Sequence, residues 1–107
     1  MFRGKQALAP NPPKKPRVTF GPVERTPGGE SETTIYLDGD DIGTIEKEVY
    51  DSSSSMGWYP VWKTAGYYVE LFKEGAPPDR WFMADDFDTG ARGALAAARA
   101  YARESLT

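Results

Sequence analysis

The segment WFMADDFDTGARGALAAARAYARE, Trp81 to Glu104, constrains the fold more than any other part of the chain. Its second half is dominated by alanine, the residue with the highest helix propensity. Because small side chains let a helix approach a sheet closely, we expect a helix over about residues 88–105, packed on strand aromatics. At about 100° per residue, its small and apolar positions share one face: Ala91, Ala94, Leu95, Ala98, Tyr101, Ala102 and Leu106.

Several short β-rich runs precede this helix. VTFGPVER, residues 18–25, is a candidate strand in which Pro22 predicts a sheet edge or a bulge. TTIYL and IGTIEKEVY flank DGDD, which predicts a hairpin with Gly39 at positive φ. In the second run Glu46 and Glu48 share a face, so one side of that strand is expected to meet water. WYPVWK, YYVELFK and RWFMAD are further candidates, with turns expected at TAG and EGAPPD.

The predicted fold class is α+β, in a single domain over residues 18–107. An antiparallel β-sheet of about 4–6 short strands, over about residues 18–85, would pack against one C-terminal α-helix. Residues 1–17 contain four prolines and little apolar content. Such a segment cannot bury enough surface to offset its ordering entropy, so we expect a flexible, disordered basic arm.

The charge is distributed unevenly between these two parts. The formal net charge is -3, from 13 basic and 16 acidic residues. The arm carries five of the basic residues and no acid, so the remaining 8 basic and all 16 acidic residues give the body a charge of -8. A basic arm on an acidic body suggests charged partners.

Histidine and cysteine are both absent. Their absence removes the commonest general base, the commonest metal ligand and the thiol nucleophile. We therefore expect no catalytic residues, no metal site and no cofactor, although a carboxylate-based enzyme with two acids in one pocket stays an alternative. A calcium loop starting at Asp38 would need an acid at Val49, so we interpret Asp38, Asp40 and Asp41 as turn residues.

Three further acids, Asp85, Asp86 and Asp88, stand before the predicted helix. Asp88 or Thr89 is expected to accept the free N–H groups of the first helical turn. Acidic side chains at that end also complement the helix dipole.

The region from Trp58 to Glu104 resembles AP2-type domains and the arm-binding domains of phage-type integrases. The resemblance covers about 45 residues of the chain and implies three antiparallel strands, one packed helix and DNA binding by the sheet. These strands offer only Lys63, Lys73 and Arg80 as basic residues, whereas such domains usually carry several arginines there. We therefore carry over the fold and not the activity. The matching positions are Trp81, Phe82, Phe87, Asp88, Thr89, Ala94, Ala97, Ala98, Tyr101 and Ala102.

The first functional hypothesis is a non-catalytic binding module. It could be a phage or mobile-element protein that binds and modulates a host protein or nucleoprotein complex, as an inhibitor or a DNA mimic. Acidic surfaces can occupy basic grooves, and exposed aromatics supply contact area. The expected protein-binding residues are Glu46, Glu48, Trp58, Trp62, Glu70, Phe72, Asp85 and Asp86.

The alternative hypothesis is a nucleic-acid-binding protein. Basic residues of the arm, strands and helix would contact phosphate, and strand aromatics would stack on bases. The expected residues are Lys5, Lys14, Lys15, Arg17, Lys63, Lys73, Arg80, Arg92, Arg99 and Arg103.

Two expectations apply to both hypotheses. No segment has the roughly 20 apolar residues of a membrane span, and the N-terminus lacks the apolar region of a secretory signal. We therefore expect a cytoplasmic protein of a bacterial or phage-infected cell. A homodimer is possible because surplus aromatics could be buried across a two-fold axis.

Overall fold

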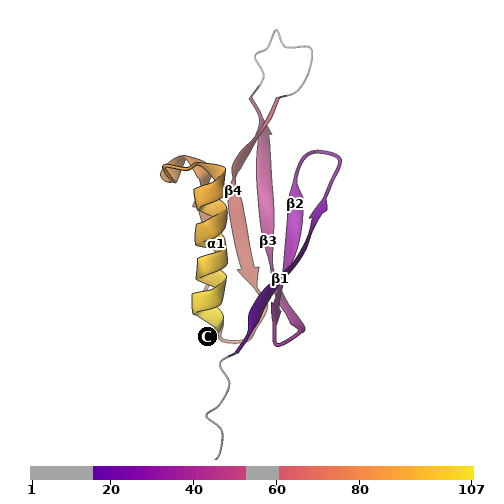
Figure 1. Cartoon of the computed structure of the whole chain (residues 1–107), viewed down its shortest axis with the longest axis vertical. Helices are drawn as coiled ribbons and strands as arrows, with labels where there is room; N and C mark the ends of the chain where they lie inside the picture. Colours follow the sequence, from indigo (N-terminus) through magenta and orange to yellow (C-terminus); the bar gives the residue numbers. More distant parts are fainter. Residues whose placement is uncertain (1–15, 53–60) are drawn as a thin grey trace, which may run out of the picture.

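The computed structural model describes residues 16–52 and 61–107. Its architecture is an open five-stranded antiparallel sheet with one C-terminal helix along one face (Figure 1). The strands follow each other in chain order across the sheet, which confirms the expected α+β class. The elements are β1 (Val18–Arg25), β2 (Ser31–Leu37), β3 (Asp40–Asp51), β4 (Trp62–Leu71), β5 (Arg80–Met83), the 3-10 helix η2 (Ala84–Asp86) and α1 (Ala91–Leu106).

The core lies between α1 and the side of the sheet that the helix covers. Ile35, Ile45 and Val69 are the largest side chains that are fully buried there. Helix α1 packs mainly on β4 and β5 and only lightly on β1. The helix therefore lies closest to β4 and β5, while the core beneath it still extends to Ile35 of β2 and Ile45 of β3.

The helical face predicted from the sequence is confirmed. Ala94, Ala98 and Ala102 are completely buried, and Leu106 closes the C-terminal end of the core. Tyr101 packs edge-on against Phe82, with 5.7 Å between ring centroids, and its hydroxyl donates a 2.7 Å hydrogen bond to the Pro78 carbonyl. Small residues therefore bring the helix close to the sheet, and an aromatic pair fills the wider end.

Two predictions about the strands and their turns are also confirmed. Asp38 and Gly39 both have positive φ, at 51° and 89°, as a two-residue hairpin turn between β2 and β3 requires. Strand β1 is an edge strand, and its pairing with β2 is interrupted between Phe20 and Val23, around Pro22. Proline cannot donate to a ladder, so its position at an irregular edge is expected.

The expected helix cap is wrong. Helix α1 begins at Ala91, its N-cap position is Gly90, and neither Asp88 nor Thr89 makes a side-chain capping bond. Phe87 packs against the core, its carbonyl accepts a hydrogen bond from the Gly90 N–H, and Gly90 at φ 65° then leads the chain into the helix. The start of α1 is therefore fixed by Phe87 packing and a glycine turn.

The expected turn at TAG is also wrong. Residues Thr64–Gly66 lie inside β4, which is one continuous strand where two were predicted. Glu48 pairs with Gly66 and Val49 with Thr64, so Ala65 is the extra residue of a bulge. Gly66 serves close packing here, because a Cβ on it would lie 2.7 Å from the Trp81 ring.

Candidate functional site

The face of the sheet opposite α1, the open face, carries a row of aligned side chains. The pairing register places Glu24 beside Glu32, Glu32 beside Glu46, Glu46 beside Tyr68, and Tyr68 beside Trp81. Since alternate residues of a strand share a face, Glu48, Glu70 and Met83 join this row from neighbouring positions. The open face thus has an acidic half, formed by β1–β3 with Glu70 of β4, and an aromatic half on β4–β5.

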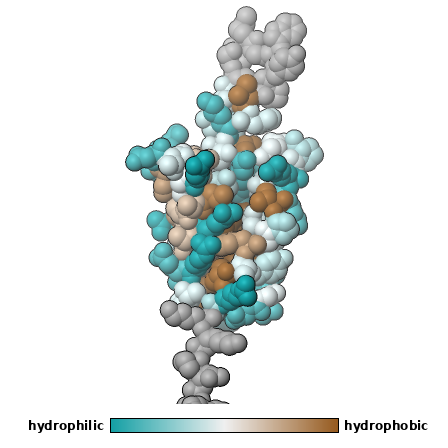
Figure 2. All heavy atoms as spheres, in the orientation of Figure 1, coloured by the Kyte–Doolittle hydropathy of each residue, from teal (hydrophilic) through white to brown (hydrophobic). Residues whose placement is uncertain are grey.

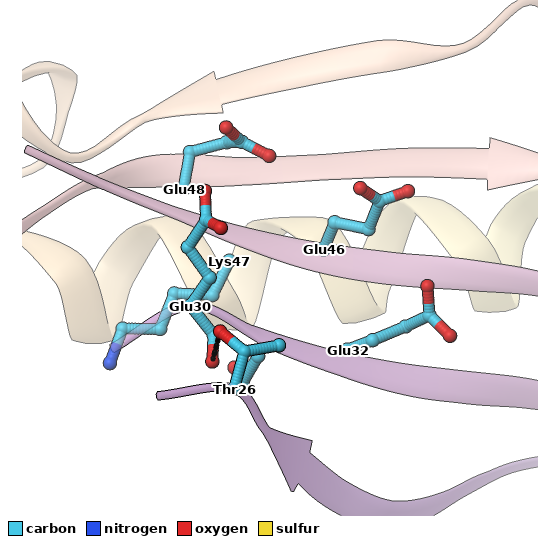
Figure 3. Close-up of a pocket in the computed structure, with 7 residues that line it drawn as sticks. Thr26, Glu30, Glu32, Glu46, Lys47 and Glu48 are labelled. Carbon is cyan, nitrogen blue, oxygen red and sulfur yellow. Dashed lines mark hydrogen bonds between the residues drawn. The ribbon is translucent and has the colours of Figure 1, made fainter. Parts of the chain in front are cut away.

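The acidic half surrounds a shallow hollow of about 140 Å³. Figure 3 shows Glu32 and Glu46 extending side by side from neighbouring strands, while Glu30 and Glu48 reach over the adjacent part of the hollow. Lys47 also lines the hollow, but its ammonium group lies apart from the four carboxylates in this view. The hollow therefore concentrates negative charge on a surface that the helix does not cover.

The pKa of Glu46 is raised above its ordinary value. Burial of the carboxyl group is the largest cause, and repulsion by Glu32, Glu48, Glu70 and Glu30 adds to it. The ionised form of Glu46 is thus disfavoured by its surroundings. A cationic group placed over this row would relieve that repulsion.

The side chains of the aromatic half of the open face are partly exposed, and neighbouring residues hold them in place. Trp81 is 38% exposed and Met83 42% exposed, and the Trp81 ring lies across Gly66. The Tyr68 hydroxyl donates a 2.7 Å hydrogen bond to Asp79, which raises the pKa of Tyr68. Rigid exposed aromatics beside charge are typical of protein-binding surfaces.

The structure brings together only part of the expected protein-binding set. Glu46, Glu48 and Glu70 share the open face. Trp62 and Phe72 are 49% and 56% exposed but lie at opposite ends of β4, about 30 Å apart, since a strand rises about 3.3 Å per residue. Asp85 and Asp86 are exposed in η2, outside the sheet. Trp58 lies outside the described residues.

Sequence reasoning missed several residues of the same face. Glu24, Glu32, Tyr68 and Trp81 belong to the row by register. The alternation of β4 separates Tyr68 and Glu70 from Tyr67 and Val69, and this signal could have placed Tyr68 beside the acids. The position of Glu32 depends on the strand register, which alternation alone does not provide.

Three of the basic residues expected to contact nucleic acid lie over aromatic rings. Arg80 stacks over Phe82 and Tyr101, at 5.0 and 5.3 Å from the ring centroids. Arg99 and Arg103 both lie over Phe20, at 5.7 and 5.0 Å. The remaining basic residues are scattered: Arg17, Lys63, Lys73 and Arg92 are exposed, and Lys5, Lys14 and Lys15 lie outside the described residues.

The part of the chain that the structure describes shows neither a metal-binding cluster nor a membrane-spanning helix. Within residues 16–52 and 61–107, no group of three or more acidic side chains converges closely enough to hold a metal ion. In the same residues, no helix is both long and apolar enough to cross a membrane. Comparison of the chain with protein-family models, curated proteins and solved structures gave no match.

Proposed function

We propose that this chain is a non-catalytic binding module whose open face binds a basic surface of a protein partner. The observation that supports the proposal most directly is the row of Glu24, Glu32 and Glu46 continuing into Tyr68 and Trp81. Acids steer and orient a basic partner, and aromatic side chains supply the desolvated contact. A nucleic-acid-handling protein, whose own groove is basic, is the class of partner that such a surface fits.

The raised pKa of Glu46 supports a cationic partner in particular. Lysine or arginine side chains above the row would restore the ionised form of Glu46 and screen it from Glu32. Arginine is the better match, since its planar guanidinium binds carboxylates through two hydrogen bonds. The free protein thus carries a repulsion that binding would remove.

The charge of the open face argues against DNA at this position. An AP2-type arrangement would place DNA on the sheet, but here that surface carries Glu46, Glu48 and Glu70. DNA affinity comes largely from phosphate neutralisation, so these acids would weaken it. Nucleic-acid binding by the N-terminal basic residues stays the alternative, and residues 1–17 are separable from the open face in an experiment.

Affinity capture with matched variants tests the proposal. The full chain is immobilised and exposed to nuclease-treated bacterial lysate, beside a Glu32→Gln/Glu46→Gln variant and a Glu104→Gln/Asp88→Asn control of equal charge. We expect the wild type and the control to retain a specific basic protein that the open-face variant loses. Retention should also decrease steeply with salt.

Two outcomes would reject the open face as the binding surface. One is capture of no specific protein by the wild-type chain. The other is capture that the open-face variant keeps but that is lost when residues 1–17 are deleted. If that arm-dependent capture increases when nucleic acid is added back to the nuclease-treated lysate, the nucleic-acid alternative is favoured.

A further inference from the structure

A second hollow lies on the helix side of the sheet, between α1 and strands β1–β4. It has a volume of about 170 Å³, well above the ~10–15 Å³ that one water needs. Figure 2, which views this side of the molecule, shows strongly hydrophilic side chains running beside apolar ones near the helix. The hollow is lined by Val23, Arg25, Ser31, Thr33, Lys47, Tyr67, Leu95 and Arg99.

The charged residues of this hollow are all cations. Arg25 comes from β1, Lys47 from β3 and Arg99 from α1, and none of the described residues that line it is acidic. The register explains the grouping on the sheet, because Arg25 pairs with Ser31 and Ser31 pairs with Lys47. Three cationic residues therefore line one hollow in a body whose net charge is negative, and their acidic neighbours Glu24, Glu46 and Glu48 belong to the other face.

Arg99 lines this hollow and has one buried donor that is not satisfied. Its guanidinium lies 5.7 Å from the centroid of the Phe20 ring, which orients it. Its Nε is buried, and within the described part of the chain it has no hydrogen-bond partner. A buried donor without a partner is unfavourable and calls for an explanation such as an absent ion or ligand.

The other polar groups of the hollow are suited to an anion. The hydroxyls of Ser31, Thr33 and Tyr67 also line it, and each can donate a hydrogen bond to an anionic oxygen. Arginine and lysine form short, charge-assisted bonds to phosphate oxygens. A tetrahedral phosphate dianion matches three cations and several hydroxyl donors better than a carboxylate does, because it has more oxygen atoms and a larger negative charge.

We propose that this hollow binds a phosphate dianion, either free phosphate or a terminal phosphate monoester, through Arg25, Lys47 and Arg99. The site lies on the helix side of the sheet, and Ser31 and Lys47 line both this hollow and the acidic hollow of the open face. It adds a small-molecule ligand to a protein otherwise described by its protein-binding surface.

The test is a phosphate titration of the full chain, followed by two-dimensional ¹H–¹⁵N NMR. Sodium chloride at matched ionic strength is the reference. We expect saturable shifts of the amide signals of Ser31, Lys47 and Leu95, with the signals of Gly39 and Trp81 unchanged. The Arg25→Gln/Lys47→Gln variant should weaken phosphate binding at least about tenfold, since each bond to a charged group contributes strongly.

Matched variants keep the result interpretable. Lys73→Gln/Arg92→Gln removes the same charge from exposed positions outside the hollow and should keep wild-type binding. Arg25 is exposed, so Arg25→Gln alone serves as the test if the double variant does not fold.

Three results would overturn the proposal. The first is a set of shifts no larger than those caused by chloride, and the second is unchanged binding in the folded Arg25 variants. The third is tighter binding, with shifts of the same amide signals, by an oligonucleotide that lacks terminal phosphates. That third result would assign the hollow to a nucleic-acid backbone, whose diester groups carry one charge each.

Discussion

Glu32 and Glu46 stand directly opposite each other in the β2–β3 ladder, and both side chains project from the open face. Like charges at directly opposed positions destabilise an antiparallel pair. The acids around them add to the repulsion at Glu46. Positions that break a local rule without local compensation are typical of functional sites. At the Glu32–Glu46 pair we therefore expect the requirement for binding a cationic partner to lower the free energy of unfolding of the free protein.

Replacing Glu46 by glutamine should stabilise the protein. The neutral amide keeps the shape of the side chain and removes the repulsion by Glu32. We expect an increase of about 0.5 kcal/mol in the free energy of unfolding, a modest value because partly exposed charges are screened. Urea denaturation near neutral pH measures it. Glu104→Gln, an exposed change on α1, is the control, and an equal gain in that variant would contradict a specific effect of the Glu32–Glu46 pair.

The gain from Glu46→Gln should depend on pH in a defined direction. The pKa of Glu46 is higher in the folded chain than its ordinary value of 4.5, so the folded state holds this proton more tightly than the unfolded state does. The stability contributed by Glu46 therefore decreases as pH rises from about 4.5 through the folded pKa, and is level above it. The difference between variant and wild type should be small near pH 4 and largest near pH 7. A difference that is constant over this range would contradict the repulsion argument.

The sequence predicted those elements whose pattern is local. The alanine spacing of α1 identified the buried positions Ala94, Ala98 and Ala102, because the helical period depends on no distant contact. The turn at Asp38–Gly39 was found because only a few residue types accept positive φ. The shared face of Glu46 and Glu48 follows from strand alternation in the same way.

The features that the sequence did not predict depend on contacts between elements. A two-residue turn at Asp38–Gly39 would pair Glu32 with Ile45, but a register shift next to Ile35 moves the partner to Glu46. That shift places Glu32 beside Glu46 in the acidic row, and no local sequence pattern predicts it. From the local sequence, Gly66 is interpreted as a turn residue. Its role is to leave space for the Trp81 ring, which comes from another strand and so has no signal near Gly66 in the sequence. Likewise, the start of α1 is determined by Phe87, which packs on the core, and by the turn at Gly90, and not by the expected Asp88 cap.

Replacing Gly66 by alanine should destabilise the β4–β5 pair. The added Cβ would lie 2.7 Å from the Trp81 ring and would also meet the Phe82 carbonyl oxygen, which is backbone and cannot rotate away. Overpacking of this kind costs about 1–3 kcal/mol in the free energy of unfolding. Urea denaturation followed by tryptophan fluorescence measures the loss. Gly28→Ala is the matched control, since no atom lies within 4 Å of its Cβ position, and a similar loss there would contradict the packing argument.

Replacing Ala98 by leucine should separate α1 from the sheet. Ala98 is completely buried in the core between helix and sheet, so there is no space for three additional carbon atoms without moving the helix. We expect the free energy of unfolding to decrease by about 1–3 kcal/mol, although leucine and alanine are both good helix formers. Ala96→Leu is the control, because Ala96 is exposed on the same helix and should tolerate the change. Equal losses in the two variants would show that helix propensity, and not close packing on β4, explains the alanine content of α1.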